Sequence, residues 1–153
     1  MNDFAIFEWQ VANRRAFEFH GAVVRCNLAT ITRVLADPCV GVRLRQPRDQ
    51  PEGARRWDEF CRIRLAPGTY RLVYTWDPSK GIVCLVMIGL HVGSGRMGDV
   101  YDLLQQAYSL GPSDGHEQER AEPCCDPAAL SEVPRLFSGR RAEAGLRQLS
   151  RRR

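Results

Sequence analysis

Arginine is concentrated in one stretch of this 153-residue sequence, and its chemistry suits contact with phosphate. Eight arginines lie between Arg43 and Arg71, against four carboxylates. The planar guanidinium can hold two phosphate oxygens at once, and a basic block favours a polyanion such as RNA because binding releases counterions. We therefore expect RNA contacts from Arg43, Arg45, Arg55 and Arg56, although a basic run is also typical of a plain solvated surface.

Three of the arginines are candidates for stabilising charge on a reacting phosphate. Arg62 and Arg64 alternate with apolar residues in a predicted strand that spans residues 60–65. Because side-chain direction repeats every two residues, both lie on one face of that strand. The solvent face of an amphipathic strand explains the same pattern. Arg71 stands in an otherwise apolar strand, where it is either part of the same site or an edge arginine paired with Asp or Glu.

Proton transfer needs other side chains, and three candidates follow the last predicted strand. The imidazole of His91 suits acid–base chemistry, while Arg96 can supply charge or anchor a phosphate. Both lie in a glycine-rich connector, residues 90–98, which we expect to be mobile. Tyr101 begins the next predicted helix and is either a catalytic phenol or a core aromatic.

The first half of the chain predicts a short strand and a helical layer. A short aromatic-rich segment predicts a strand at residues 4–9. Apolar spacings of three and four predict one amphipathic helix over residues 22–36, with a further helical turn or two within 12–19. The density of proline and glycine makes residues 37–56 a surface loop, and the core resumes at Trp57.

The second half predicts the sheet that carries the arginines. Three strands at residues 60–65, 70–76 and 82–88 are joined by two turns and form a meander. Asp99 can cap a following helix that ends near Gly111. Strands and helices in this order indicate an α+β fold.

We expect one domain in residues 1–111, followed by a polar C-terminal extension over 112–153. Residues 112–127 have the composition of a linker, and 128–149 are marginally helical. The acidic part of the extension, Glu117 to Asp126, either folds back over the arginines as an internal mask or is inert.

Six cysteines are present, and their spacing is not typical of zinc ligands, so we predict neither a metal nor a cofactor. The first ten residues lack the pattern of a secretory signal. The longest apolar run, residues 82–90, is about half of the ~20 residues that a membrane span needs. We therefore expect reduced cysteines, a cytoplasmic location and no membrane contact.

The segment CRIRLAPGTYRLVY, from Cys61 to Tyr74, precedes an apolar strand, Gly89 and Asp99-Val100-Tyr101. Together with Arg33-Val34-Leu35-Ala36-Asp37-Pro38, it resembles the RelE/ParE toxin superfamily of type II toxin-antitoxin systems, and is closest to the RelE branch. The resemblance covers about residues 22–108. It implies a small α+β domain in which an N-terminal strand and a helical hairpin pack on an antiparallel sheet meander with a C-terminal helix.

The resemblance also implies a function. By this resemblance we expect an mRNA endoribonuclease that inhibits translation at the ribosomal A site, where the ribose 2′-hydroxyl attacks the adjacent phosphate. Arg62, Arg64, Arg71 and Tyr101 match the RelE residue set. The connector is longer than in RelE, so counting forward from Gly89 selects His91, and counting back from Tyr101 selects Arg96.

The expected partners are a cognate antitoxin, the ribosome and mRNA. Two alternatives share the fold: a ParE-like toxin that binds DNA gyrase, and a degenerate, non-catalytic binding protein. Fold alone does not separate them.

Overall fold

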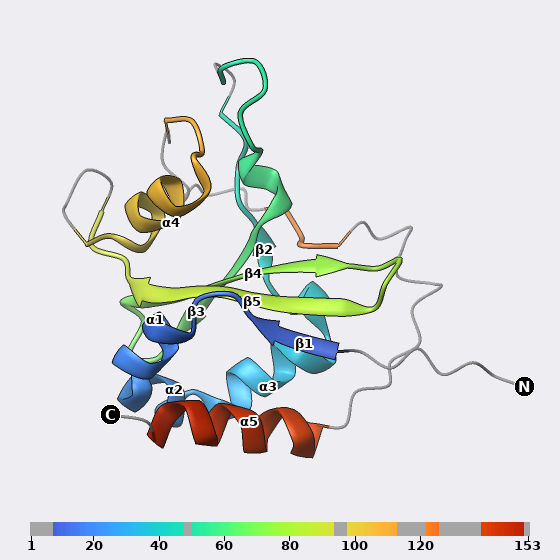
Figure 1. The fold of residues 1–153 in the computed structure, drawn as a ribbon, viewed down its shortest axis with the longest axis vertical. Coiled ribbons are helices and arrows are strands. Elements are labelled where there is room, and N and C mark those ends of the chain that lie inside the picture. The colour runs from blue at the N-terminus through green and yellow to red at the C-terminus, as the bar shows by residue number, and fades with distance from the viewer. Residues whose placement is uncertain (1–7, 48–49, 94–97, 113–121, 126–138, 152–153) are drawn as a thin grey trace, which may run out of the picture.

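A mixed five-stranded sheet forms the centre of the computed structural model, which describes residues 8–47, 50–93, 98–112, 122–125 and 139–151 (Figure 1). The strand order is β1-β5-β4-β3-β2. β1 (Glu8–Val11) is parallel to β5 (Ile82–Leu90), and the other neighbouring strands are antiparallel. The α+β class is confirmed. The meander is antiparallel as predicted, and the parallel pairing of β1 with β5 makes the whole sheet mixed.

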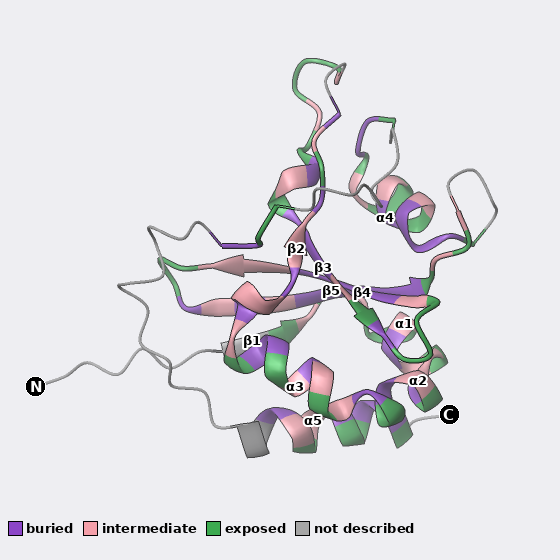
Figure 2. Cartoon of the chain, turned by 180° about the vertical axis from the view of Figure 1, so that it is seen from behind, coloured by how far each residue is buried: buried purple, intermediate pink, exposed green. Residues whose placement is uncertain are grey.

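The predicted meander is confirmed as β3 (Cys61–Leu65), β4 (Tyr70–Asp77) and β5. β4 lies between β3 and β5, so it is a central strand of the sheet. The predicted surface loop before the meander also contains a two-residue strand, β2 (Val42–Arg43), which pairs with β3. In Figure 2 the central strands are largely buried.

The predicted helix over residues 22–36 is two helices, α2 (Gly21–Cys26) and α3 (Leu28–Ala36), preceded by α1 (Arg14–Phe19). The break lies at Asn27, whose side chain is buried and bonds to the backbone of α2 and to that of Ala66, outside the helices. Its amide nitrogen donates to the carbonyls of Val23 (2.9 Å) and Ala66 (3.0 Å), and its amide oxygen accepts from the Ala66 N–H (2.8 Å). Asparagine competes with helical backbone hydrogen bonds in this way.

A further helix, α5 (Gly139–Arg151), packs across the other three on the same face of the sheet (Figure 1). A Cβ atom at Gly21 would lie 2.8 Å from the Ser150 carbonyl oxygen, so the absence of a side chain there permits the close approach of α2 and α5. Ala142 and Leu146 are fully buried in the core that α1–α3 also line. This part of the predicted extension therefore belongs to the core, whereas most of the acidic segment, residues 117–121 and 126, lies outside the described residues.

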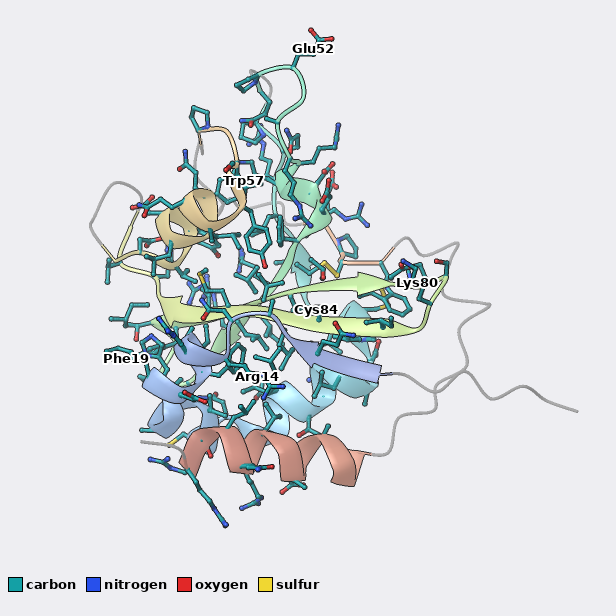
Figure 3. All side chains as sticks on the ribbon, viewed as in Figure 1. Arg14, Phe19, Glu52, Trp57, Lys80 and Cys84 are labelled. Atoms are coloured by element: carbon teal, nitrogen blue, oxygen red, sulfur yellow. A yellow bond between two sulfur atoms is a disulfide. The ribbon has the colours of Figure 1, made fainter. Side chains whose placement is uncertain are left out.

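The sheet separates two hydrophobic cores. The core on the helical face includes Phe17, Val24, Ile31, Leu72, Tyr74 and Leu85. On the opposite face, α4 (Val100–Tyr108) contributes to a second core that includes Leu44, Trp57, Phe60, Val73, Val86, Val100 and Leu104. The indole of Trp57 is buried beside α4 and donates to the Gly111 carbonyl at 3.0 Å (Figure 3). No helix within the described residues is long and apolar enough to cross a membrane.

Two disulfides attach residues 122–125, which we call the strap, to the main body of the protein. Cys124 is bonded to Cys61 in β3, and Cys125 is bonded to Cys39. The strap also lies along β2, with the Cys124 N–H donating to the Gly41 carbonyl (3.1 Å) and the Arg43 N–H donating to the Glu122 carbonyl (2.9 Å).

The expectation of reduced cysteines is therefore wrong for four of the six, while Cys26 and Cys84 are free. The bonded partners are 63 and 86 residues apart, so their spacing gave no local signal. Disulfides persist in oxidising compartments and are rare in the cytoplasm. They thus suit an oxidising compartment better than the cytoplasmic location expected from the sequence.

Candidate functional site

The sheet register brings three of the predicted catalytic arginines to one face. Arg62 is paired with Val73, Arg64 with Arg71, and Arg71 with Gly89 on the other side. Residues directly opposite each other in neighbouring strands point to the same face. Because Val73 packs in the core that α4 lines, all three arginines lie on the α4 face.

Two of these arginines are buried, which excludes a plain solvent face for them. Arg71 is 4% exposed and Arg62 is 7% exposed, whereas Arg64 is exposed. A plain solvent face therefore accounts for Arg64 alone. The Arg71 guanidinium donates from Nη1 to the carbonyls of Gly68 (2.6 Å) and Tyr70 (3.0 Å). Since β4 is a central strand, Arg71 is not an edge arginine.

Arg64 and Arg71 face each other directly across the β3–β4 ladder. Opposed residues have Cβ atoms about 5 Å apart, and like charges in such pairs destabilise a sheet. Guanidinium groups bind phosphate oxygens through paired N–H bonds, so two arginines on neighbouring strands of one face offer donors of the kind that a phosphate accepts. The arrangement therefore suits a phosphate-binding site.

His91 and Tyr101 lie on the same face, beside Arg71. The backbone N–H of His91 donates to the Thr69 carbonyl at 2.7 Å, which continues the β4–β5 ladder beyond Leu90. By alternation, His91 points to the same face as Gly89, which is opposite Arg71. The His91 and Tyr101 rings meet edge to face, with centroids 5.1 Å apart.

Gly89 positions α4 over this part of the sheet. A Cβ atom at Gly89 would lie 3.2 Å from the Val100 Cβ atom, closer than most such contacts, so glycine permits the N-terminus of α4 to approach the strand. Tyr101 is in the first turn of α4 and is buried. We call Arg62, Arg64, Arg71, His91 and Tyr101 the sheet-face cluster.

The predicted RNA-binding arginines do not join this cluster. Arg43 is paired with Cys61, which packs on the helical face, and its Nη2 donates to the Cys124 carbonyl at 2.9 Å. Arg55 forms an ion pair with Glu59 (3.0 Å) and lies over the rings of Phe60 and Tyr108.

Arg56 binds both carboxylate oxygens of Asp58, at 2.9 and 2.6 Å. This contact raises the pKa of Arg56 and lowers that of Asp58, chiefly through the side-chain hydrogen bond. Arg45 is exposed. Arg96 lies outside the described residues, so the structure does not decide between His91 and Arg96.

Asp99 also belongs to this site, but the sequence predicted it only as a helix cap. The carboxylate does cap α4, because it accepts the Tyr101 N–H at 2.9 Å. The carboxylate also contacts the His91 ring at 3.0 Å. An aspartate before a helix predicts a cap, but nothing local to the sequence predicts that the connector folds back to place a histidine against it.

Among the residues that the structure describes, no group of three or more His, Cys, Asp or Glu side chains is arranged to hold a metal ion. Comparison with protein-family models, with curated proteins and with solved structures finds no match for this chain. The resemblance to the RelE/ParE superfamily therefore rests on the sequence motif alone.

Proposed function

We propose that this protein is a RelE-like toxin that cleaves RNA at the sheet-face cluster. One observation carries the proposal: Arg64 and Arg71 face each other on neighbouring strands, on the face that also presents His91 and Tyr101. Paired guanidinium groups suit a phosphodiester, and an adjacent imidazole and phenol suit proton transfer.

In the proposed reaction the ribose 2′-hydroxyl attacks the adjacent phosphorus. The bond from O2′ to phosphorus forms as the bond from phosphorus to O5′ of the next nucleotide breaks, which leaves a 2′,3′-cyclic phosphate and a 5′-hydroxyl. The arginines of the cluster stabilise the charge that develops on the five-coordinate phosphate. His91 takes the proton of the 2′-hydroxyl and Tyr101 gives a proton to O5′, after which water restores both groups.

The RelE resemblance supports mRNA in the ribosomal A site as the substrate, and an antitoxin as the partner that restrains the toxin. The two disulfides favour a second candidate, in which the same chemistry acts on free RNA in an oxidising compartment. The two candidates differ in substrate and compartment, and they share the cluster.

The test compares free RNA with mRNA bound in ribosomes, each with oxidised and with reduced protein. The variant is Arg64→Gln, whose exposed side chain can change without loss of core packing. The matched control is Arg33→Gln, an exposed arginine in α3 on the helical layer. Removing one stabilising charge from a reacting phosphate should lower the cleavage rate by about 100-fold, and the control should retain the wild-type rate.

Cleavage of ribosome-bound mRNA alone would support the A-site substrate, and cleavage of free RNA by the oxidised protein would support the second candidate. Failure to cleave either RNA would refute the proposal. If expression of the inactive protein still arrested growth, a gyrase supercoiling assay would test the ParE-like alternative. If growth also continued, a non-catalytic binding protein would be the better description.

A further inference from the structure

The carboxylate of Asp99 organises the connector around His91 more extensively than a helix cap requires. Asp99 is 0% exposed. Its Oδ1 accepts the Tyr101 N–H, which is the cap itself. Its Oδ2 accepts the N–H groups of Val92 (2.9 Å) and Gly93 (3.1 Å) and lies 3.0 Å from His91 Nδ1.

The contact between Asp99 and His91 determines which ring nitrogen carries the proton. A carboxylate oxygen that already accepts two backbone N–H groups is an acceptor, so the imidazole nitrogen facing it must be the donor. His91 Nδ1 is therefore protonated, and the lone pair of the neutral ring resides on Nε2. A free histidine has no such constraint.

We propose that Asp99 is a positioning residue that fixes His91 in the Nδ1–H tautomer and directs Nε2 to the reacting proton. The tautomer follows from the contacts around Asp99, and its consequence for catalysis rests on the proposed RNA cleavage. The carboxylate also stabilises the imidazolium that forms when Nε2 takes the proton of the 2′-hydroxyl. An aspartate behind a catalytic histidine acts in this way in other enzymes.

A helix cap alone would not need a carboxylate. Serine, threonine and asparagine cap helices about as well as aspartate. Asp99 faces four donors, two of them in the connector backbone and one on the imidazole ring. The amide of asparagine has a single acceptor oxygen. In Asp99→Asn the amide nitrogen must therefore face either the Tyr101 N–H or the donors that Oδ2 now accepts, those of Val92, Gly93 and His91.

The first test observes the tautomer directly, without reference to activity. Long-range proton–nitrogen NMR of the imidazole rings, recorded at about pH 8 where histidine is neutral, distinguishes a protonated nitrogen from one with a free lone pair. The His91 signals are assigned by their loss in His91→Gln. We expect protonated Nδ1 in the wild-type protein and a shift toward protonated Nε2 in Asp99→Asn. Protonated Nε2 in the wild-type protein would overturn the proposal.

The second test is a double-mutant cycle on cleavage of a fluorophore-labelled single-stranded RNA, or of ribosome-bound mRNA if only that is cleaved. Asp99→Asn should lower kcat by about 100-fold, within the usual contribution of acid–base catalysis. In the His91→Ala background the same change should have less than about a threefold effect, because the histidine on which it acts is absent. Asp102→Asn, also in the first turn of α4, is the control and should retain the wild-type rate.

A purely structural role predicts a different result. Loss of a cap would lower stability equally in both backgrounds, and its effect on kcat would be the same with and without His91. Equal effects on kcat would overturn the positioning role while leaving RNA cleavage established. If the wild-type protein cleaves no RNA, the proposed function and the catalytic part of this inference both fail, and the NMR result decides the tautomer alone.

Discussion

Loss of the bond between Cys61 and Cys124 should cost the protein a measurable part of its stability. The relevant loop is not the full separation of 63 residues. While the outer bond between Cys39 and Cys125 is intact, the path from Cys61 to Cys124 runs through it and is roughly 23 residues long. In the chain-entropy model, a loop of this length corresponds to about 3 kcal/mol at 25 °C.

The test compares the wild-type protein with the double variant Cys61→Ala/Cys124→Ala, using urea unfolding monitored by circular dichroism. A loss of about 3 kcal/mol corresponds to a melting temperature lower by roughly 10 °C for a domain of this size. Cys84 is a half-buried free cysteine, so the stability lost in Cys84→Ala measures the cost of removing a thiol side chain. Cys26 is exposed, and Cys26→Ala should not change the free energy of unfolding. A loss below about 1 kcal/mol after correction, or a wild-type protein that unfolds identically with and without reductant, would refute the reasoning.

Three further predictions concern the site, the C-terminal helix and pH. Tyr101→Phe should slow RNA cleavage by about tenfold or more while near-ultraviolet circular dichroism stays unchanged; an unchanged rate would remove Tyr101 from the mechanism. Leu146→Ala should lower the free energy of unfolding in urea by about 3 kcal/mol because Leu146 is fully buried, and exposed Ala144→Ser should cost less than about 0.5 kcal/mol. Burial lowers the pKa of His20 below 6.5, so its contribution to stability is complete above about pH 6.5 and is lost as the pH falls; urea titrations at several pH values should show a flatter profile for His20→Gln.

The meander could be predicted from the sequence because its signals are local. Alternation in residues 60–65 and the turn after Leu65 place strand residues opposite each other, and the observed β3–β4 register follows. The same locality explains why Arg62 and Arg64 could be placed on one face of a strand, whereas the sequence left the position of Arg71 open. The register also supplies what the sequence did not, namely that Arg64 and Arg71 are directly opposed.

Long-range contacts account for what the sequence did not predict. Asn27 interrupts a continuous helical pattern because its side chain bonds to Ala66, 39 residues away. Helix α5 was assigned to a marginal extension because its composition is strongly polar. Its buried residues Ala142, Leu146 and Leu149 recur at helical spacings of four and three, so an apolar stripe was present in the sequence. That stripe is stabilised only by packing against α1–α3, which composition does not reveal.

The inner disulfide and the sheet-face cluster lie on opposite faces of the sheet, although Cys61 and Arg62 are neighbours in β3. Cys61 and Cys124 pack in the core of the helical face, whereas Arg64 and Arg71 lie on the α4 face. The backbone hydrogen bonds of β3, β4 and β5 and the N-terminus of α4 position the residues of the cluster.

Reduction should therefore lower stability without rearranging the cluster. In the chain-entropy model, opening both disulfides costs about 8 kcal/mol in total, which is comparable with the whole free energy of unfolding of an ordinary domain. A ligand that binds the folded state would offset part of this loss, because such a ligand adds to the stability of the folded protein. The redox state of the compartment thus determines how much of the protein is folded.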